Sequence, residues 1–206
     1  MKFGAWGILG IVLVAGACAV APGDPPAPSS SASAPSTSAS GDPLANPDPS
    51  RYASQVVNYA REAGINAQLL MAILYNENYK PHDPAAERAW QKIKPDAAFG
   101  VANMHKATFD ETKRSRPFAG RAWDELPDDP GLAIEAAAWY LHDLKTSLPA
   151  AHAGFTTDEL LALGYNTGPG NMRAFAKGTK PGSAAQSYLD SLHSNWGKAA
   201  QALQHS

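Results

Sequence analysis

Glu77 is the residue of this sequence best placed for acid and base chemistry. It follows Leu70, Ile73 and Leu74 by seven, four and three residues, a spacing that puts all four side chains on one face of a helix. Pro81 and the asparagines on either side of Glu77 indicate that this helix ends within about a turn. Apolar neighbours and a helix C-terminus both disfavour a carboxylate, and a carboxyl group that keeps its proton near neutral pH can act as a general acid. The same spacing also fits a carboxylate at the edge of an apolar face, solvated or paired with Lys or Arg.

The elements that would position Glu77 are helices. Gly64 is a predicted C-cap, Asn66 a predicted N-cap, Asp129 before Pro130 a helix start, and Thr156 with Glu159 a capping box. We predict helices at 52–63, 67–77, 105–113, 130–148, 157–165 and 184–202, and a short one near 85–90 in an otherwise irregular loop of 79–100. No long stretch alternates as strands do. The fold class is therefore mainly α, a single helical domain, with any sheet confined to 79–100.

Composition limits the functions that this domain can have. From Arg51 onward Lys plus Arg and Asp plus Glu are 16 each, so the basic excess of a nucleic-acid binder is missing. The chain has one cysteine, which excludes an internal disulfide, and it has no Cys/His metal spacing and no Gly-rich phosphate loop. We expect no metal, no other cofactor and no nucleic acid, and a monomer.

The N-terminal 50 residues predict export and a tether. Residues 1–17 have the charged start, apolar middle and small-residue end of a signal peptide. Cys18, the only cysteine, stands where a lipobox would place a lipidated first residue; cleavage at the Ala-x-Ala site or after Ala21 is the alternative. Residues 18–50 are dominated by Pro, Ser and Ala, which is typical of a disordered linker. We expect a protein at the cell surface, attached to the membrane only through Cys18, or otherwise secreted.

A second segment with chemical potential is Gly164-Tyr165-Asn166-Thr167-Gly168-Pro169-Gly170-Asn171. Here an aromatic hydroxyl and an amide at a helix end run into a Gly-Pro-Gly turn, which leaves the backbone accessible. By itself this pattern also fits an ordinary junction between helices.

Three segments together resemble a known family. In order they are Ala72-Ile73-Leu74-Tyr75-Asn76-Glu77, Phe99-Gly100-Val101-Ala102-Asn103-Met104, and the segment from Gly164 to Asn171. They are similar to the lytic transglycosylase domain of the soluble lytic transglycosylase type, which is related to goose-type lysozyme. The resemblance covers about residues 52–200 and implies a lysozyme-like domain with a groove for peptidoglycan glycan strands, so that residues 51–206 would form the transglycosylase domain.

The resemblance also implies a mechanism with one carboxyl group. Glu77 would protonate the glycosidic oxygen between N-acetylmuramic acid and N-acetylglucosamine, while the N-acetyl carbonyl of the muramic acid stabilises C1. Glu77 would then deprotonate the 6-hydroxyl, which closes a 1,6-anhydro ring. Tyr165 would hydrogen-bond Glu77, and the N-acetylated sugar would be held by Asn166 and by the backbone near Gly100 and Met104. Asn103 is either a further sugar contact or a helix cap.

Three departures from the family pattern stand out. Asn78 follows Glu77 where the family has Ser, Asn103 replaces the Gln of its Gly-Leu-Met-Gln block, and the segment between Glu77 and Gly100 is longer. Within this longer segment Asp83 or Glu87 could supply a second carboxylate, although solvation is the more usual state of such residues. Of Trp90, Phe99 and Trp123, all able to stack on sugars, we expect two in the core, and His82, His105 and His142 share no metal-ligand spacing.

Three functions remain open at this point. The first is a lytic transglycosylase. The second is a catalytically silent peptidoglycan-binding surface module, which Asn78 and the altered second segment favour. The third is a hydrolytic lysozyme, in which water rather than the 6-hydroxyl attacks C1.

Overall fold

A computed structural model describes residues 47–204 of the chain. The predicted signal peptide, Cys18 and most of the predicted linker lie outside these residues. The described part is helical, and its only strand-like pairing is an isolated bridge between Phe99 and Met104. The expectation of a mainly α fold without a regular sheet is confirmed for this part of the chain.

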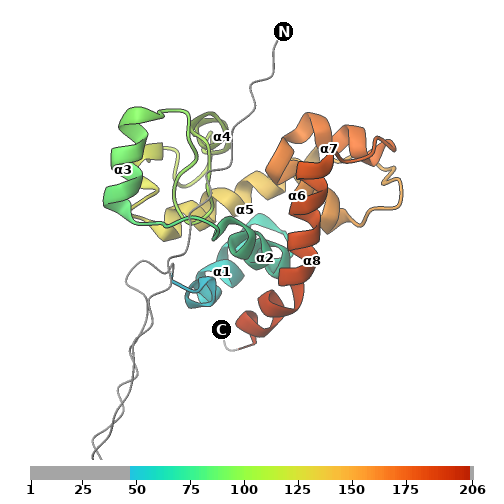
Figure 1. Cartoon of the computed structure of the whole chain (residues 1–206), viewed down its shortest axis with the longest axis horizontal. Helices are drawn as coiled ribbons and strands as arrows, with labels where there is room; N and C mark the ends of the chain where they lie inside the picture. The colour runs from blue at the N-terminus through green and yellow to red at the C-terminus, as the bar shows by residue number, and fades with distance from the viewer. Residues whose placement is uncertain (1–46, 205–206) are drawn as a thin grey trace, which may run out of the picture. The chain divides into compact units, whose positions relative to one another are not determined.

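Eight α-helices and two short 3-10 helices follow one another along residues 47–204 (Figure 1). Their bounds are η1 Pro49–Tyr52, α1 Ala53–Ala63, α2 Ala67–Glu77, α3 Pro84–Ile93, α4 Lys106–Thr112, η2 Trp123–Glu125, α5 Pro130–Thr146, α6 Thr157–Thr167, α7 Pro169–Ala176 and α8 Ser183–Leu203.

The helix ends follow the capping signals of the sequence. Gly64 ends α1 in the left-handed conformation, with φ at 65°. The side chains of Asn66, Asp129 and Thr156 each accept a hydrogen bond from a backbone N–H in the first turn of the helix that follows. Each cap satisfies a backbone group that the first turn would leave unpaired.

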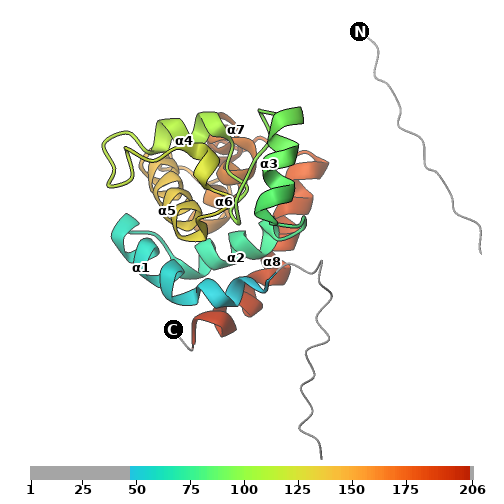
Figure 2. The same cartoon turned by 90° about the vertical axis from the view of Figure 1, so that its left-hand side faces the viewer.

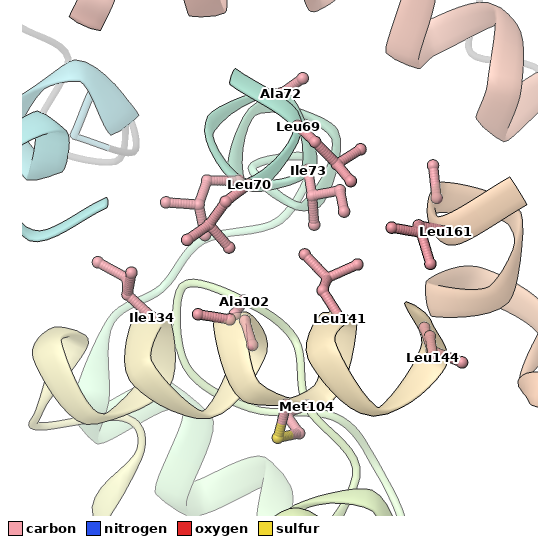
Figure 3. Close-up of a cluster of buried hydrophobic side chains, with 14 of the residues drawn as sticks. Leu69, Leu70, Ala72, Ile73, Ala102, Met104, Ile134, Leu141, Leu144 and Leu161 are labelled. Atoms are coloured by element: carbon pink, nitrogen blue, oxygen red, sulfur yellow. The ribbon is translucent and has the colours of Figure 1, made fainter. Parts of the chain in front are cut away.

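Helix α2 is the centre of the domain. It packs against α1, α6 and α8, and Figures 1 and 2 both show it between α1 and α8. Every residue from Leu69 to Tyr75 is buried. In Figure 3 Leu70 and Ile73 face Ile134 and Leu141 of α5. An apolar helix enclosed in this way is held by burial rather than by its own propensity.

Three features differ from the predicted elements. Asp48 caps η1, and its carboxylate also accepts a hydrogen bond from the Tyr75 hydroxyl at 2.8 Å. Residues 48–50, which we assigned to the linker, therefore belong to the folded domain. Helix α3 is longer than predicted. Helix α7 occupies a region where we predicted only a turn. Pro169 is compatible with this helix because it stands in the first turn, where its missing N–H is not needed.

Candidate active site

Glu77 is the last residue of α2, and its carboxyl group is enclosed by two side chains from distant parts of the sequence. The residue is 7% exposed. Its Oε1 accepts a hydrogen bond from the Tyr188 hydroxyl of α8 at 2.8 Å, and its Oε2 accepts one from Asn103 Nδ2 at 3.1 Å. Burial raises the pKa of Glu77, while the hydrogen bonds from Tyr188 and Asn103 act in the opposite direction. The carboxyl group of Glu77 is therefore buried at the end of α2 and hydrogen-bonded through both of its oxygens.

Asn103 joins the carboxyl group of Glu77 to the end of its helix. Its Nδ2 also donates to the Glu77 carbonyl oxygen at 2.8 Å, which caps the C-terminus of α2. The opposite orientation of the amide is excluded, since it would place Oδ1 against this carbonyl and the carboxylate. Oδ1 is buried and has no hydrogen-bond partner within residues 47–204. It is therefore an oriented acceptor beside Glu77.

The predicted hydrogen bond between Tyr165 and Glu77 is wrong. The Tyr165 hydroxyl donates to the Ala102 carbonyl oxygen at 2.7 Å, and Tyr188 takes the expected place at Glu77. A phenol has one proton to donate, and the proton of Tyr165 is used at Ala102. Burial, with the nearby charge of Glu77, raises the pKa of both tyrosines well above the usual range, so both stay protonated.

Glu87 is neither solvated nor free to act as a second carboxylate. It is 5% exposed, and its Oε2 accepts the backbone N–H of Gly100 at 2.9 Å. Its Oε1 lies 3.0 Å from His82 Nδ1 and 3.7 Å from Lys80 Nζ. Asp83 caps α3 by accepting from the Ala86 N–H. The two extra carboxylates of the long loop are thus used to hold that loop.

His82 links the Glu87 cluster to α2. Its Nε2 lies 3.2 Å from the Glu77 carbonyl oxygen, and its Nδ1 faces Glu87. Because a carbonyl only accepts, Nε2 must carry a hydrogen to bond the Glu77 carbonyl. The electrostatic effect of His82 contributes to lowering the pKa of Glu77.

The backbone N–H groups of Gly100 and Met104 make hydrogen bonds within the protein. The N–H of Gly100 is bound by Glu87, and that of Met104 donates to the Phe99 carbonyl. Neither N–H is free to donate to a sugar. Gly100 has φ at 70°, and an added Cβ would meet the Leu126 carbonyl oxygen at 2.8 Å, so only glycine fits there.

The other predicted side chains lie in different environments. Asn166 is exposed on the last turn of α6, and its side chain has no hydrogen-bond partner in the described part of the chain. Asn78 is the C-cap of α2 and lines a cavity of about 150 Å³ that His82 and Val101 also line.

The three candidate aromatic residues divide as expected. Phe99 and Trp123 are buried, with ring centroids 4.9 Å apart in an edge-to-face contact. Trp90 on α3 is 50% exposed. The expectation that two of these three lie in the core is confirmed.

A small cleft lies next to Asn103. It has a volume of about 30 Å³ and is lined by Asn103, Met104, His105, Thr108, Tyr140 and Tyr165. Within residues 47–204 no cluster of three or more His, Cys, Asp or Glu side chains is arranged to hold a metal ion. No helix in this range is both long enough and apolar enough to span a bilayer.

The helical domain with one buried, hydrogen-bonded carboxyl group at the end of its central helix belongs to the class of lysozyme-like proteins. Residues 55–188 match the family described as the Transglycosylase SLT domain, and the chain belongs to this family. Family membership indicates a lytic transglycosylase and implies peptidoglycan as the substrate. No curated protein matches the chain significantly.

Proposed function

We propose that the protein is a peptidoglycan lytic transglycosylase in which Glu77 acts first as acid and then as base. It cleaves the β-1,4 bond between N-acetylmuramic acid and N-acetylglucosamine. The observation that carries this proposal is the carboxyl group of Glu77, buried, held by Tyr188 and Asn103 and shifted to a higher pKa by burial. A raised pKa keeps the proton available for the leaving oxygen near neutral pH.

The mechanism needs one proton-transfer group. Protonated Glu77 gives its proton to the glycosidic oxygen as the bond to C1 breaks, and the N-acetyl carbonyl of the muramic acid stabilises the positive charge at C1. The carboxylate of Glu77 then takes the proton of the 6-hydroxyl, whose oxygen bonds to C1. The hydrogen bonds from Tyr188 and Asn103 stabilise the carboxylate between the two steps.

The engagement of both candidate carboxylates in the segment 79–100 supports this route over a nucleophilic one. A retaining glycosidase places its two carboxyl groups about 5 to 5.5 Å apart, the second as nucleophile. Glu87 is bound by Gly100, His82 and Lys80, and Asp83 caps α3. Neither is available to attack C1.

Sugar binding in this proposal comes from side chains. Asn103 and Tyr165 line the small cleft beside Glu77, and the exposed Asn166 amide follows Tyr165 directly in the chain. Asn78 is the C-cap of α2, and Tyr188 and Asn103 supply the hydrogen bonds to the carboxylate oxygens.

The test is mass spectrometry of the soluble products after incubation of the protein with purified peptidoglycan, beside Glu77→Gln. Glu62→Gln, at an exposed carboxylate of α1, is the matched control. We expect anhydro-muropeptides from the parent protein and Glu62→Gln, and a loss of at least about 100-fold in Glu77→Gln. Hydrated products would indicate a lysozyme, and no products from the folded parent protein would indicate a binding module.

We also propose that export and lipidation of Cys18 place the domain at the cell surface. The Pro, Ser and Ala composition of the following residues supports a flexible arm between anchor and domain. Cys18→Ala should move the protein from the membrane fraction to the soluble fraction, and unchanged membrane association would contradict lipid anchoring.

A further inference from the structure

The small cleft beside Asn103 continues into a larger one. Thr108 of α4 and Tyr140 of α5 line both cavities, so the two adjoin. The second has a volume of about 390 Å³, and its other walls include Glu111, Gly168 and Arg173. We call this second cavity the α4/α7 cleft, since Glu111 of α4 and Arg173 of α7 both line it, with α5 crossing between these helices (Figure 1). If a sugar binds in the small cleft beside Asn103, a substituent of that sugar that extends past Thr108 and Tyr140 enters the α4/α7 cleft.

Two opposite charges face the α4/α7 cleft without pairing. Glu111 and Arg173 are exposed, and within residues 47–204 neither side chain makes a hydrogen bond or an ion pair. The third charged wall residue, Asp143, is paired with Arg116 at 2.5 Å. One cation and one anion on different helices thus remain for a ligand that carries both charges.

The polar environment between these charges suits a peptide. Burial, with the negative charges of Glu111 and Asp143, raises the pKa of Tyr140 to about 12, so its hydroxyl remains a donor at neutral pH. That hydroxyl is 3.5 Å from the Gly164 carbonyl, a weak contact that leaves it able to bind a ligand. Leu144 and Pro169 add apolar area to the same cleft.

We propose that the α4/α7 cleft binds the peptide stem carried by the muramic acid of the substrate, with Arg173 on a stem carboxylate and Glu111 on a stem amine. This proposal rests on the proposed function, because it needs peptidoglycan in the neighbouring cleft. The uncharged N-acetylglucosamine units give an unpaired Arg and Glu no partner, whereas a stem with free carboxylates and a diamino acid has groups of both signs. The protein therefore prefers peptide-bearing over peptide-free glycan.

Binding tests this proposal independently of catalysis. The Glu77→Gln full-length protein is titrated by calorimetry with peptidoglycan tetrasaccharides that carry stems and with the same tetrasaccharides after amidase has removed the stems. Adding Arg173→Gln should weaken binding of the peptide-bearing form about five- to tenfold and change binding of the bare form less than about twofold. Glu111→Gln should show the same selectivity. Lys177→Gln, which removes a positive charge just beyond α7 and outside the cleft lining, is the control and should change neither.

Each result decides the proposal. If Arg173→Gln weakened the binding of both ligands equally, the cleft would be a sugar subsite. If it weakened the binding of neither, these charges would have no role in ligand binding. Either outcome would overturn the proposal. A parent protein that binds as predicted but releases no products overturns the catalytic proposal alone. Arg173 and Glu111 are exposed, so circular dichroism should show unchanged folding in both variants.

Discussion

At the scale of single residues, the acid/base behaviour of Glu77 depends on which donors reach its two oxygens. Tyr188 reaches Oε1 from α8 and Asn103 reaches Oε2 from the loop before α4. Both hydrogen bonds favour the carboxylate, while burial favours the protonated acid. The balance lets one group give a proton and later take one back.

Tyr188→Phe tests this balance. The change removes a donor to the carboxylate, so the pKa of Glu77 rises further and the alkaline limb of the pH dependence of kcat/KM moves to higher pH. We expect kcat to fall about tenfold, since one hydrogen bond that orients and stabilises the carboxylate is lost. The measurement is the rate of anhydro-muropeptide release between pH 4 and pH 9.

Tyr165→Phe is the matched comparison. The Tyr165 hydroxyl binds the Ala102 carbonyl and not Glu77. Its removal should therefore leave the position of the alkaline limb nearly unchanged. If Tyr165→Phe moved the limb and Tyr188→Phe did not, the roles that the geometry gives to the two tyrosines would be reversed.

The sequence predicted Glu77 but not Tyr188, and the reason is sequence separation. The apolar face of α2 can be read from residues three and four apart. The partner hydroxyl lies 111 residues away, in a helix for which we predicted the range but no site residue. The family resemblance led us to assign this hydrogen bond to Tyr165. Tyr165 lies near Glu77, but its hydroxyl donates to the Ala102 carbonyl oxygen.

At the scale of elements, the long segment between Glu77 and Gly100 is a support and not only a surface loop. Through Glu87 and His82 it connects three backbone positions, the start of α3, the C-terminus of α2 and the turn at Gly100. The burial of Glu87 depends on contacts such as the one with Gly100, 13 residues away, which a local sequence pattern does not predict. From the sequence we therefore expected a solvated carboxylate. Capping signals such as Asn66 and Thr156 were readable because donor and acceptor are two or three residues apart.

Glu87→Ala tests the support. It leaves the Gly100 N–H without its acceptor, and it removes the hydrogen-bond partner of His82 and the counter-charge of Lys80. We expect the free energy of unfolding to fall by about 2 to 4 kcal/mol, the cost of breaking a buried charged cluster. Urea denaturation followed by circular dichroism measures it.

The control for this prediction is Asp83→Ala. It removes a carboxylate from the same segment, but one that caps α3 at an exposed position, for which the expected loss is about 1 kcal/mol. A loss in Glu87→Ala no larger than that in Asp83→Ala would show that the Glu87 cluster adds nothing beyond an ordinary cap.

At the scale of the whole molecule, the central helix combines the best-buried apolar residues with a carboxyl group at its end. Leu70, Ile73 and Leu74 are at most 1% exposed, and Glu77 follows them in the same helix. A carboxylate in this position opposes folding, because its charge is taken from water into the protein. The site that we propose for catalysis should therefore lower the stability of the whole domain.

Stability as a function of pH makes this cost measurable. Burial holds the pKa of Glu77 above that of the same side chain in the unfolded chain, so the folded protein binds more protons between the two pKa values. The contribution of Glu77 to stability is then fully present below the unfolded pKa and is lost as pH rises through the folded pKa. Groups whose pKa the fold lowers, such as Asp48, Asp129 and Glu159, act in the opposite direction at acid pH. Subtracting the stability of the parent protein from that of a Glu77 variant at each pH removes the contribution of these other groups.

Glu77→Gln should therefore stabilise the protein in a pH-dependent way. Glutamine carries no charge and can still accept from Asn103 and donate to the oxygen of Tyr188. We expect Tm to equal that of the parent near pH 4 and to exceed it by about 2 to 4 °C at pH 8, the shift that about 1 kcal/mol produces in a domain of this size. Glu62→Gln, at an exposed carboxylate, should change Tm by less than about 1 °C at both pH values. A difference between Glu77→Gln and parent that stays constant from pH 4 to pH 8 would mean that Glu77 does not change protonation in the folded protein over this range, and it could then not serve as both acid and base.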